Sequence, residues 1–480
     1  RLGESLSQIR SDFVALPNAT TSSLEALRYW VQSDSLWTAG QFAEAATLLN
    51  LAIEEDSAFA LAHSSLALYH FFNNRRDEGE SHLQRAMADV GRLAVHERLW
   101  IEAQARSLRG DQRGAISLYR AYLDRDSTDR DAWYNLAKAH ERLHECDEAV
   151  ALYHKVLRLD PGNAGAYINI ATCQNNLGKW TDAIASYERA FTLQPDWVTA
   201  YYLNHEYGNA FVALGSYDSA AVIFGKMLDD PDAMDQARGH RSLGLLEMAR
   251  GRYSDAAEHL QRAAQLNSAM GAALSEYRDR LHLAVVQDAR GQQDAAHREI
   301  QRAYALAQAS RFEPGFLAYG GRLLARAGRT KQAESLLEQI AERGYDNAAD
   351  GAAHAFVKGE IALARGEHEA ALEALGRAHD LDPQNHYYLA SLADAYRAVG
   401  RLDDAFAAYD EVVQATPHGW EAQHPAALAL LESGRILELR GDTAGAIAAY
   451  RALSDAWAGG QDDLSMLVET RTRLARLAGS

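Results

Sequence analysis

Apolar and polar residues along the chain repeat with the period of an amphipathic α-helix, and a turn signal interrupts them every 34 to 41 residues. Runs of this length predict one helix on each side of every signal. Glycine tolerates a positive φ and ends helices, so it is the preferred residue in such turns. The signals stand at Gly40, Asn74, Gly110, His144, Gly178, Gly215, Gly251, Gly291, Gly328, Gly366, Gly400 and Gly441. The sequence therefore predicts an all-α chain of about twelve repeated helix pairs.

The residues that follow each turn also repeat. Alanine stands five residues after eleven of the turns, and Gly79 takes this place after Asn74. A large residue, such as Tyr153 or Tyr187, follows four positions later. A small residue lets the second helix of a pair approach the first closely, and the large residue fills the groove beside it. Because one pair cannot bury its own apolar faces, the pairs are predicted to stack into a solenoid.

One unit shows the whole pattern in a single stretch, AWYNLAKAHERLHECDEAVALYHKVLRLDPGN (Ala132–Asn163). This stretch, its period and its closing Asp-Pro resemble the tetratricopeptide repeat, and the resemblance covers about Ala26–Trp457. The resemblance implies a right-handed superhelical solenoid of about twelve helix pairs with a terminal capping helix.

The units vary along the chain, which suggests five segments. We expect an N-terminal helix and linker at 1–25, units 1–6 at 26–231, divergent units 7–9 at 232–346, units 10–12 at 347–457 and a capping helix at 458–480. In the divergent stretch the spacing widens and closing prolines are missing, which predicts longer loops or a change in superhelical pitch. The capping helix would carry Arg471, Arg473 and Arg476 on a polar face.

The N-terminal quarter carries a second resemblance. Segments such as LGESL and HERLWIEAQARSLRGD, within residues 2–111, resemble the repeat region of bacterial eukaryotic-type serine/threonine kinases and of winged-helix transcriptional activators. This resemblance implies a sensory or scaffolding part of a larger bacterial regulator. The chain itself has no kinase motif, no glycine-rich phosphate loop and no recognisable helix-turn-helix. It begins without methionine, and we expect it to be a piece of a longer protein.

Composition narrows the classes of partner. The formal charge of −18 argues against nucleic acid, whose phosphates are neutralised by Lys and Arg. No apolar run approaches the roughly 20 residues of a transmembrane helix. Cys146 and Cys173 form neither a disulfide framework nor a metal motif, so the compartment and the pairing of these thiols stay open. With no nucleophile motif either, we expect a non-catalytic chain without cofactor or metal.

One motif offers a different function. HERLH (His140–His144) fits H-E-x-x-H, in which two histidines one turn apart bind zinc and the glutamate is the general base. Such a site would make the chain a zinc-dependent hydrolase. Against this alternative, His144 occupies a repeat turn, and no third ligand stands at a familiar spacing.

Protein or peptide binding is the leading prediction, because in tetratricopeptide solenoids the first helix of each pair lines a concave groove. The positions that face inward carry aromatic residues early in the chain and polar residues later. Aromatic groups can take the side chains of a bound segment, and amides can pair with its backbone. The candidate groove residues are Trp30, Trp37, Phe71, Trp100, Tyr134, Lys138, Asn175, Asn176, Tyr202 and Asn209.

Two alternatives stay open for these residues and for the chain. The aromatic residues can instead be core residues between neighbouring helices, and the asparagines can be solvated residues in a last helical turn. A solenoid can also assemble head to tail into filaments through its flat ends.

Overall fold

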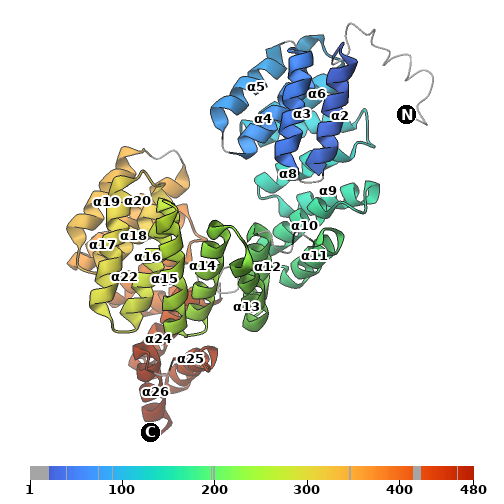
Figure 1. Cartoon of the computed structure of the whole chain (residues 1–480). Helices are drawn as coiled ribbons and strands as arrows, with labels where there is room; N and C mark the ends of the chain where they lie inside the picture. Colours follow the sequence, from blue (N-terminus) through green and yellow to red (C-terminus); the bar gives the residue numbers. More distant parts are fainter. Residues whose placement is uncertain are drawn as a thin grey trace. The chain divides into compact units, whose positions relative to one another are not determined.

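The computed structural model describes residues 21–38, 41–73, 75–88, 90–195, 197, 201–344, 347–414, 423–461 and 463–479, without the side chains of residues 38, 92, 201–203 and 423–425. This part of the chain forms twelve pairs of α-helices and one final helix, and contains no strand (Figure 1). The predicted all-α repeat solenoid is therefore confirmed. None of the helices in these described ranges is long and apolar enough to cross a membrane.

The chain divides into two compact units, which are described separately. Unit 1 comprises residues 1–177 with 188–193, and unit 2 comprises residues 178–187 with 194–480. Of the expected N-terminal helix and linker at 1–25, residues 1–20 lie outside the described residues.

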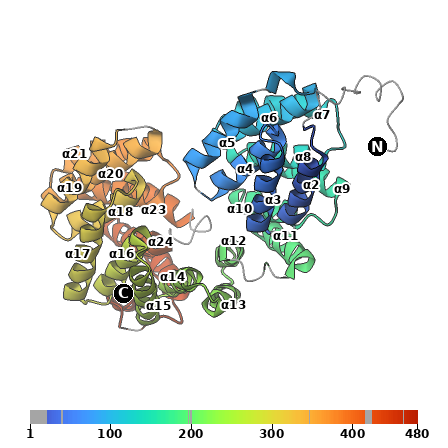
Figure 2. The same ribbon diagram turned by 45° about the horizontal axis from the view of Figure 1, so that its top comes forward.

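Unit 1 stacks its helix pairs in chain order, and its helices lie side by side in both views (Figures 1 and 2). Its helices are α2 (Leu24–Thr38), α3 (Phe42–Glu55), α4 (Ala60–Phe72), α5 (Arg76–Ala88), α6 (Val95–Leu108), α7 (Gln112–Leu123), α8 (Arg130–Arg142), α9 (Cys146–Leu159) and α10 (Ala164–Asn176). A short 3-10 helix, η2 (Val90–Arg92), precedes α6. Helix α11 (Trp180–Leu193) contributes residues to both units.

Unit 2 continues the same arrangement and ends in an unpaired helix. Its helices are α12 (Tyr201–Ala213), α13 (Tyr217–Lys226), α14 (Ala233–Ala249), α15 (Tyr253–Ala269), α16 (Ala273–Ala289), α17 (Gln293–Ala309), α18 (Pro314–Arg326), α19 (Thr330–Glu342), α20 (Ala348–Arg365), α21 (His368–Leu381), α22 (His386–Ala398), α23 (Leu402–Gln414), α24 (Gln423–Leu439), α25 (Thr443–Ala456) and α26 (Ser465–Ala478). The 3-10 helix η4 (Met227–Asp229) follows α13. We call the even-numbered helices up to α24 first helices and the odd-numbered helices second helices.

The predicted turns are present wherever the structure describes them. The nine described turn glycines have φ between 70° and 89°, a region that disfavours side chains. His144 takes the same left-handed conformation with φ of 59°. The turn signals at Gly40 and Asn74 lie outside the described residues.

The second helices approach the first helices at small residues. The alanine five residues after each turn is buried in all eleven units that carry one. On the first helix, the facing position is often glycine: a Cβ on Gly208 would lie 2.2 Å from the Phe224 ring, and one on Gly434 would lie 2.3 Å from the Tyr450 ring. Phe71 lies over Gly79 in the same way, since a Cβ there would lie 2.7 Å from its ring. This contact explains why that unit has glycine where the others have alanine.

The divergent stretch differs from the expectation of longer loops. Helices α14, α15, α16 and α17 each have 17 residues, against 13 for α8 and 14 for α9. The turns between them stay short, and Gly271 forms an additional left-handed turn after α15. Because no proline stops these helices, the extra residues lengthen the helices instead of the connections.

Unit 2 has a contact that joins its C-terminal part to its early repeats. The closing segment (Trp457–Gln461) follows α25 and lies on the turn between α14 and α15, and Figure 2 shows α24 next to α14. Trp457 Nε1 donates to the carbonyl of Ala249 at 3.1 Å, and Gln461 N donates to the carbonyl of Gly251 at 2.9 Å. Gln461 Oε1 accepts from Ser254 N at 3.0 Å and thereby caps the start of α15.

The same contact is also apolar. Trp457 is 2% exposed, and its ring meets Tyr253 edge to face at 5.6 Å between centroids. A Cβ on Gly251 would lie 2.7 Å from the Trp457 ring, so the turn glycine is needed for close approach as well as for its φ. Leu464 and Leu467 extend the same buried cluster to α26. Repeats more than 200 residues apart thus share one core.

We predict that Trp457→Ala lowers the free energy of unfolding of unit 2 by about 3–5 kcal/mol, the usual cost of truncating a buried tryptophan. Hydrogen exchange should become faster in α14 and α15 as well as in α25, because the closing segment holds all three. Exchange measured by mass spectrometry on the full chain tests this. Trp133→Ala in unit 1 is the control and should leave α14 unchanged. Faster exchange confined to α24–α26 would contradict the prediction.

Candidate functional site

The candidate groove residues with described side chains all lie on first helices. In unit 1, α2 carries Trp30 and Trp37, α4 carries Phe71, α6 carries Trp100, α8 carries Tyr134 and Lys138, and α10 carries Asn175 and Asn176. Asn209 lies on α12 in unit 2. Tyr202 belongs to the same helix, but its side chain lies outside the described residues.

Side-chain hydrogen bonds join successive first helices of unit 1 into one wall. Trp30 Nε1 on α2 donates to Ser65 Oγ on α4 at 3.3 Å. Between α4 and α6, Ser64 donates to Gln104. Between α6 and α8, an Arg142 guanidinium nitrogen donates to Ser107 Oγ at 2.8 Å. The next contact, between α8 and α10, is made by Asn169.

Asn169 is the centre of a polar network on this wall. Its Nδ2 donates to Tyr134 Oη at 2.7 Å, and its Oδ1 lies 3.4 Å from Lys138 Nζ. Lys138 Nζ also donates to Glu141 Oε1 at 2.7 Å, and Tyr153 Oη donates to Glu141 Oε2 at 2.7 Å. The network therefore fixes Tyr134 and Lys138, two of the predicted groove residues.

Asn169 itself was not among the candidate residues. It stands nine residues before the turn of its unit, as Asn135 does in the unit before. This repeated asparagine is the signal in the sequence that could have identified Asn169. Asn169 is largely buried, so it positions its neighbours rather than presenting its own amide.

The aromatic candidates have part of their rings in contacts between helices. Trp30 packs at 6.2 Å from Phe59, and Trp37 meets Phe42 edge to face at 4.9 Å. Trp100 contacts Tyr119 at 6.1 Å, and all three tryptophan–aromatic distances are between ring centroids. None of these tryptophans is fully buried or fully exposed. Each therefore packs against neighbouring aromatic residues and keeps part of its surface exposed.

Asn175 and Asn176 differ in their surroundings. Asn175 is buried and Asn176 is exposed, and Asn176 Nδ2 lies 3.9 Å from Cys146 Sγ. Consecutive residues of a helix point about 100° apart, so the two amides do not share one face. Asn209 is partly buried.

The HERLH histidines occupy different environments. His140 is buried, and its Nδ1 donates to Glu145 Oε2 at 2.6 Å. His144 forms the turn. Among the described residues, the group of three or more ligand atoms that come close enough for a metal ion consists of His96, Asp126 and Asp129, and it includes neither HERLH histidine.

The two cysteines are buried and unpaired. Both belong to the core cluster formed by α8, α9 and α10. Burial, with the neighbouring Cys146, raises the pKa of the Cys173 thiol well above its ordinary value. A thiol held protonated is a poor nucleophile.

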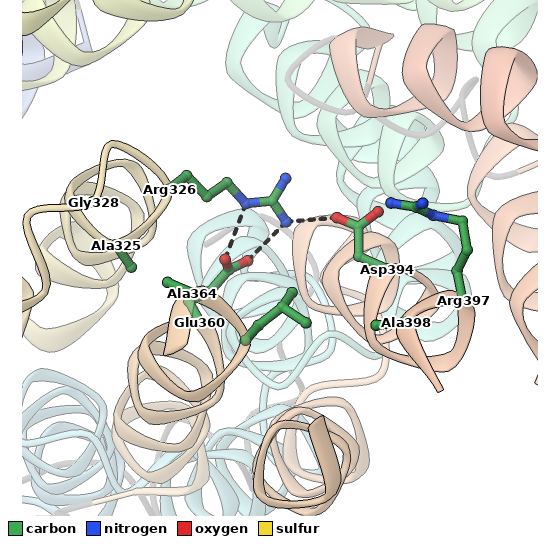
Figure 3. A pocket seen from close by; sticks show the side chains of 9 residues that line it. Ala325, Arg326, Gly328, Glu360, Ala364, Asp394, Arg397 and Ala398 are labelled. Carbon is green, nitrogen blue, oxygen red and sulfur yellow. Dashed lines mark hydrogen bonds and ion pairs between the residues drawn. The ribbon is translucent and has the colours of Figure 1, made fainter. Parts of the chain in front are cut away.

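Ion pairs join several first helices of unit 2. Arg326 on α18 donates to both oxygens of Glu360 on α20, at 3.0 and 3.1 Å, and to Asp394 on α22 at 2.7 Å (Figure 3). Glu360 is 1% exposed, and it also accepts from Ser391 and lies 3.4 Å from Arg322. Two arginines and two carboxylates thus join three consecutive first helices.

Arg326, Glu360 and Asp394 border a cleft of about 350 Å³. Its apolar lining comes from Ala325, Leu363, Ala364 and Ala398, and Arg397 stands beside Asp394 at its edge (Figure 3). The charged groups at this cleft already bind one another, so a ligand would have to compete with them.

The ion pairs continue to the end of unit 2. Arg397 reaches Glu432 on α24 at 3.5 Å, and Arg435 on the same helix donates to Glu469 on α26. From α26, Arg473 and Arg476 reach back to Glu438 on α24. Of the arginines predicted for a polar face of the capping helix, Arg473 and Arg476 therefore hold this helix against α24.

We predict that Asp394 makes the stability of unit 2 sensitive to acid. Burial alone would raise the pKa of Asp394, but Arg326 and the hydrogen bond from Tyr409 bring it below its ordinary value. A carboxyl with a lowered pKa stabilises the fold above its unfolded-state pKa, and this contribution is lost as the pH falls through the folded-state pKa. Denaturant unfolding curves at neutral pH and near pH 3, about one unit below the ordinary pKa of an aspartate, measure this loss of stability.

Asp394→Asn should be less stable at neutral pH and should show a smaller loss in acid. Asp404→Asn is the control, because this carboxylate pairs with Arg401 at the surface of α23. If Asp394→Asn lost as much stability between neutral pH and pH 3 as the unchanged chain does, Asp394 would not be the source of the acid sensitivity.

Comparison with known proteins places the repeat pattern in a family. The sequence matches the tetratricopeptide repeat family at residues 102–164, 134–197, 207–270, 320–386, 356–419 and 390–460, which together cover more than half of the chain. No curated protein matches this chain. The resemblance of residues 2–111 to kinase and winged-helix regulators is not supported by these matches and stays a prediction.

Several solved structures are similar to part of this chain. YrrB, described as a tetratricopeptide protein with an unusual peptide-binding site, is 18% identical over 36% of this chain and 87% of its own, with a TM-score of 0.24. MamA is 19% identical over 34% of this chain and 95% of its own, with a TM-score of 0.23. A tetratricopeptide protein from Parabacteroides merdae is 17% identical over 55% of this chain and 98% of its own, with a TM-score of 0.42. The family matches, together with the helix pairs and their turns, show that the chain belongs to the tetratricopeptide repeat family.

Proposed function

We propose that this chain is a non-catalytic scaffold that binds a segment of another protein along the first helices of unit 1. The observation that carries the proposal is the wall formed by α2, α4, α6, α8 and α10, on which partly exposed aromatic rings are followed by a fixed polar network. Family membership supports a role in protein–protein interaction.

The chemistry of the wall favours a peptide-like ligand. Trp30, Trp37 and Trp100 offer apolar surface for side chains of the ligand, and aromatic anchors of this kind dominate binding energies. Lys138 can donate to a ligand carbonyl because it is held in place while remaining about one-third exposed. The overall charge of −18 disfavours a polyanionic partner.

Unit 1 suits this role better than unit 2. The first helices of unit 2 bind one another through Arg326, Glu360 and Asp394, and a ligand there would have to compete with these partly buried ion pairs. The wall of unit 1 has no comparable chain of ion pairs among its described residues, so its accessible groups can bind at lower cost.

We further propose that the chain is the sensory or scaffolding region of a larger bacterial regulator. The support is the resemblance of residues 2–111 to the repeat regions of such regulators. Sequencing the gene upstream of the codon for Arg1 tests this proposal, and an open reading frame that starts there with no effector domain would contradict it.

The binding proposal predicts a graded response to substitution. A photo-crosslinker placed at Trp37 identifies the bound segment in a lysate of the source organism, and titration calorimetry with the synthetic segment then compares variants. Trp100→Ala should weaken binding by about 2 kcal/mol or more, which is roughly thirtyfold, because truncated aromatic anchors cost this much. Lys138→Ala should weaken it less, since it removes one partly exposed contact.

Controls separate binding from folding. Gln84→Ala, on the exposed side of the second helix α5, should bind with unchanged affinity. Circular dichroism must show unchanged helix content in Trp100→Ala, because this ring also packs on Tyr119. If Gln84→Ala weakened binding while neither first-helix variant did, or if the bound segment slowed hydrogen exchange only at residues beyond Gly291, the proposal would be wrong.

A further inference from the structure

Arg322 is a buried arginine in unit 2 whose hydrogen-bond donors are unused. It lies on α18 and is 5% exposed. A guanidinium group has five N–H donors, and in the part of the chain that the structure describes none of those of Arg322 donates to a protein group. Its Nε is buried and has no hydrogen-bond partner. A buried donor of this kind in a native structure points to an acceptor from outside the chain.

The carboxylate beside Arg322 is already bound by other groups. Glu360 Oε1 lies 3.4 Å from Arg322 Nε and makes no hydrogen bond with it. Both oxygens of Glu360 accept from Arg326, at 3.0 and 3.1 Å, and Oε1 also accepts from Ser391. Burial and the charge of Arg326 lower the pKa of Arg322, and Glu360 does not offset them. The groups of the chain therefore do not fully compensate this cation.

Two tyrosine rings form an apolar surface next to the guanidinium group. Cζ of Arg322 lies 5.4 Å from the centroid of the Tyr387 ring on α22. This ring meets the ring of Tyr319 on α18 edge to face, at 5.2 Å between centroids. Both tyrosines are half-buried, and His282 on α16 packs against Tyr319 at 5.7 Å between centroids. Three first helices thus supply flat rings beside one uncompensated cation.

We propose that Arg322 binds the carboxylate group of a small aromatic acid, with the ring of the ligand against Tyr319 and Tyr387. A guanidinium group and a carboxylate match each other through two parallel hydrogen bonds. The terminal nitrogens of Arg322 are not among the buried groups without a partner, so they reach the surface and can make these bonds. Aromatic rings of the ligand and the protein can pack edge to face, as the two tyrosines do with each other.

The charges around Arg322 select a ligand with a single negative charge. Arg322 and Arg326 face Glu360 and Asp394, so the chain itself supplies two charges of each sign. One added carboxylate meets the cation that is least compensated. The second charge of a phosphate would be repelled by Glu360 and Asp394. A carboxylate therefore fits this site better than a phosphate does.

The size of the ligand follows from the neighbouring contacts. A small acid would use donors of Arg322 that no described protein group uses. A peptide would extend along α18 and α22 to Arg326 and Asp394, which already bind each other at 2.7 Å. A peptide would have to compete with this pair, whereas a small acid would not. The proposal is independent of the binding that we propose for unit 1.

A purely structural role of Arg322 makes a different prediction. A buried charge without hydrogen bonds costs free energy, because desolvation is not repaid. Arg322→Met keeps most of the length of the side chain and removes the charge. We therefore expect Arg322→Met to be at least as stable as the unchanged chain in denaturant unfolding without ligand. A clear loss of stability would show that Arg322 supports the fold and would contradict the proposal.

The test uses benzoate as the probe and the full chain. Saturation-transfer difference NMR, which detects weak binding through the signals of the ligand, gives the dissociation constant by titration. Benzamide, which has the same ring without the charge, should bind about tenfold more weakly or less, and so should inorganic phosphate in competition with benzoate. Arg322→Met should weaken benzoate binding by about tenfold or more, since it removes two charge-assisted hydrogen bonds. Arg322→Lys, which keeps the charge without the planar fork, should also bind more weakly.

Arg290→Gln is the matched control. Arg290 also has a buried Nε without a partner, but its Nη1 donates to Gln287 at 3.2 Å. This variant should bind benzoate as the unchanged chain does, and benzoate should raise the melting temperature of both but not that of Arg322→Met. The proposal is overturned if benzoate does not bind, if benzamide binds equally well, or if Arg322→Met and Arg322→Lys keep full affinity. Tighter binding of the peptide acetyl-Gly-Glu-Gly-amide than of benzoate would assign the site to a protein partner and would also overturn it.

Discussion

The close approach of two helices at a residue no larger than alanine is the contact on which every repeat depends. Where the first helix has glycine, as at Gly208 and Gly434, a ring of the second helix occupies the space of the missing side chain. Where the second helix has glycine, at Gly79, Phe71 of the first helix does the same. The large residue of such a contact can stand on either helix, provided that a small residue stands opposite it on the other helix. The two helices can then approach equally closely in both cases. The stack can therefore continue through units whose sequences differ widely.

This contact uses one face of each first helix. A second face of the same helix is free to vary in sequence, and the two units use this second face differently. In unit 1 it carries hydrogen bonds and partly exposed rings around Asn169 and Trp100. In unit 2 it carries buried ion pairs around Glu360. Buried ion pairs contribute little net stability, because desolvation offsets their attraction. Because a ligand would have to compete with these pairs, we place the proposed binding on the face of unit 1.

Local sequence patterns were sufficient to predict the repeat. They were not sufficient to predict the contacts that join distant repeats. The turns, the buried alanines and the helix pairs follow from spacings of a few residues, so they could be predicted. The contact of Trp457 with Ala249 could not, because nothing in either repeat encodes a partner 208 residues away. The sequence analysis left longer loops or a changed superhelical pitch open for the divergent stretch and did not predict the lengthened helices α14–α17, because a wider spacing does not say where the extra residues go. On the candidate wall, side-chain type indicated Trp100 and Lys138, but the role of Asn169 depends on which neighbours it reaches.

The closing segment changes how the stability of unit 2 should be understood. In an open solenoid each repeat contacts only its neighbours, and stability is a sum of local terms. The Trp457 ring and the Gln461 cap add a term that exists only when α14, α15 and α25 are all folded. Such a term couples the early repeats of unit 2 to its last pair, so these repeats resist local opening together. The ion pairs that run from α18 to α26 lie between these coupled ends, so they too depend on the stack remaining folded as a whole.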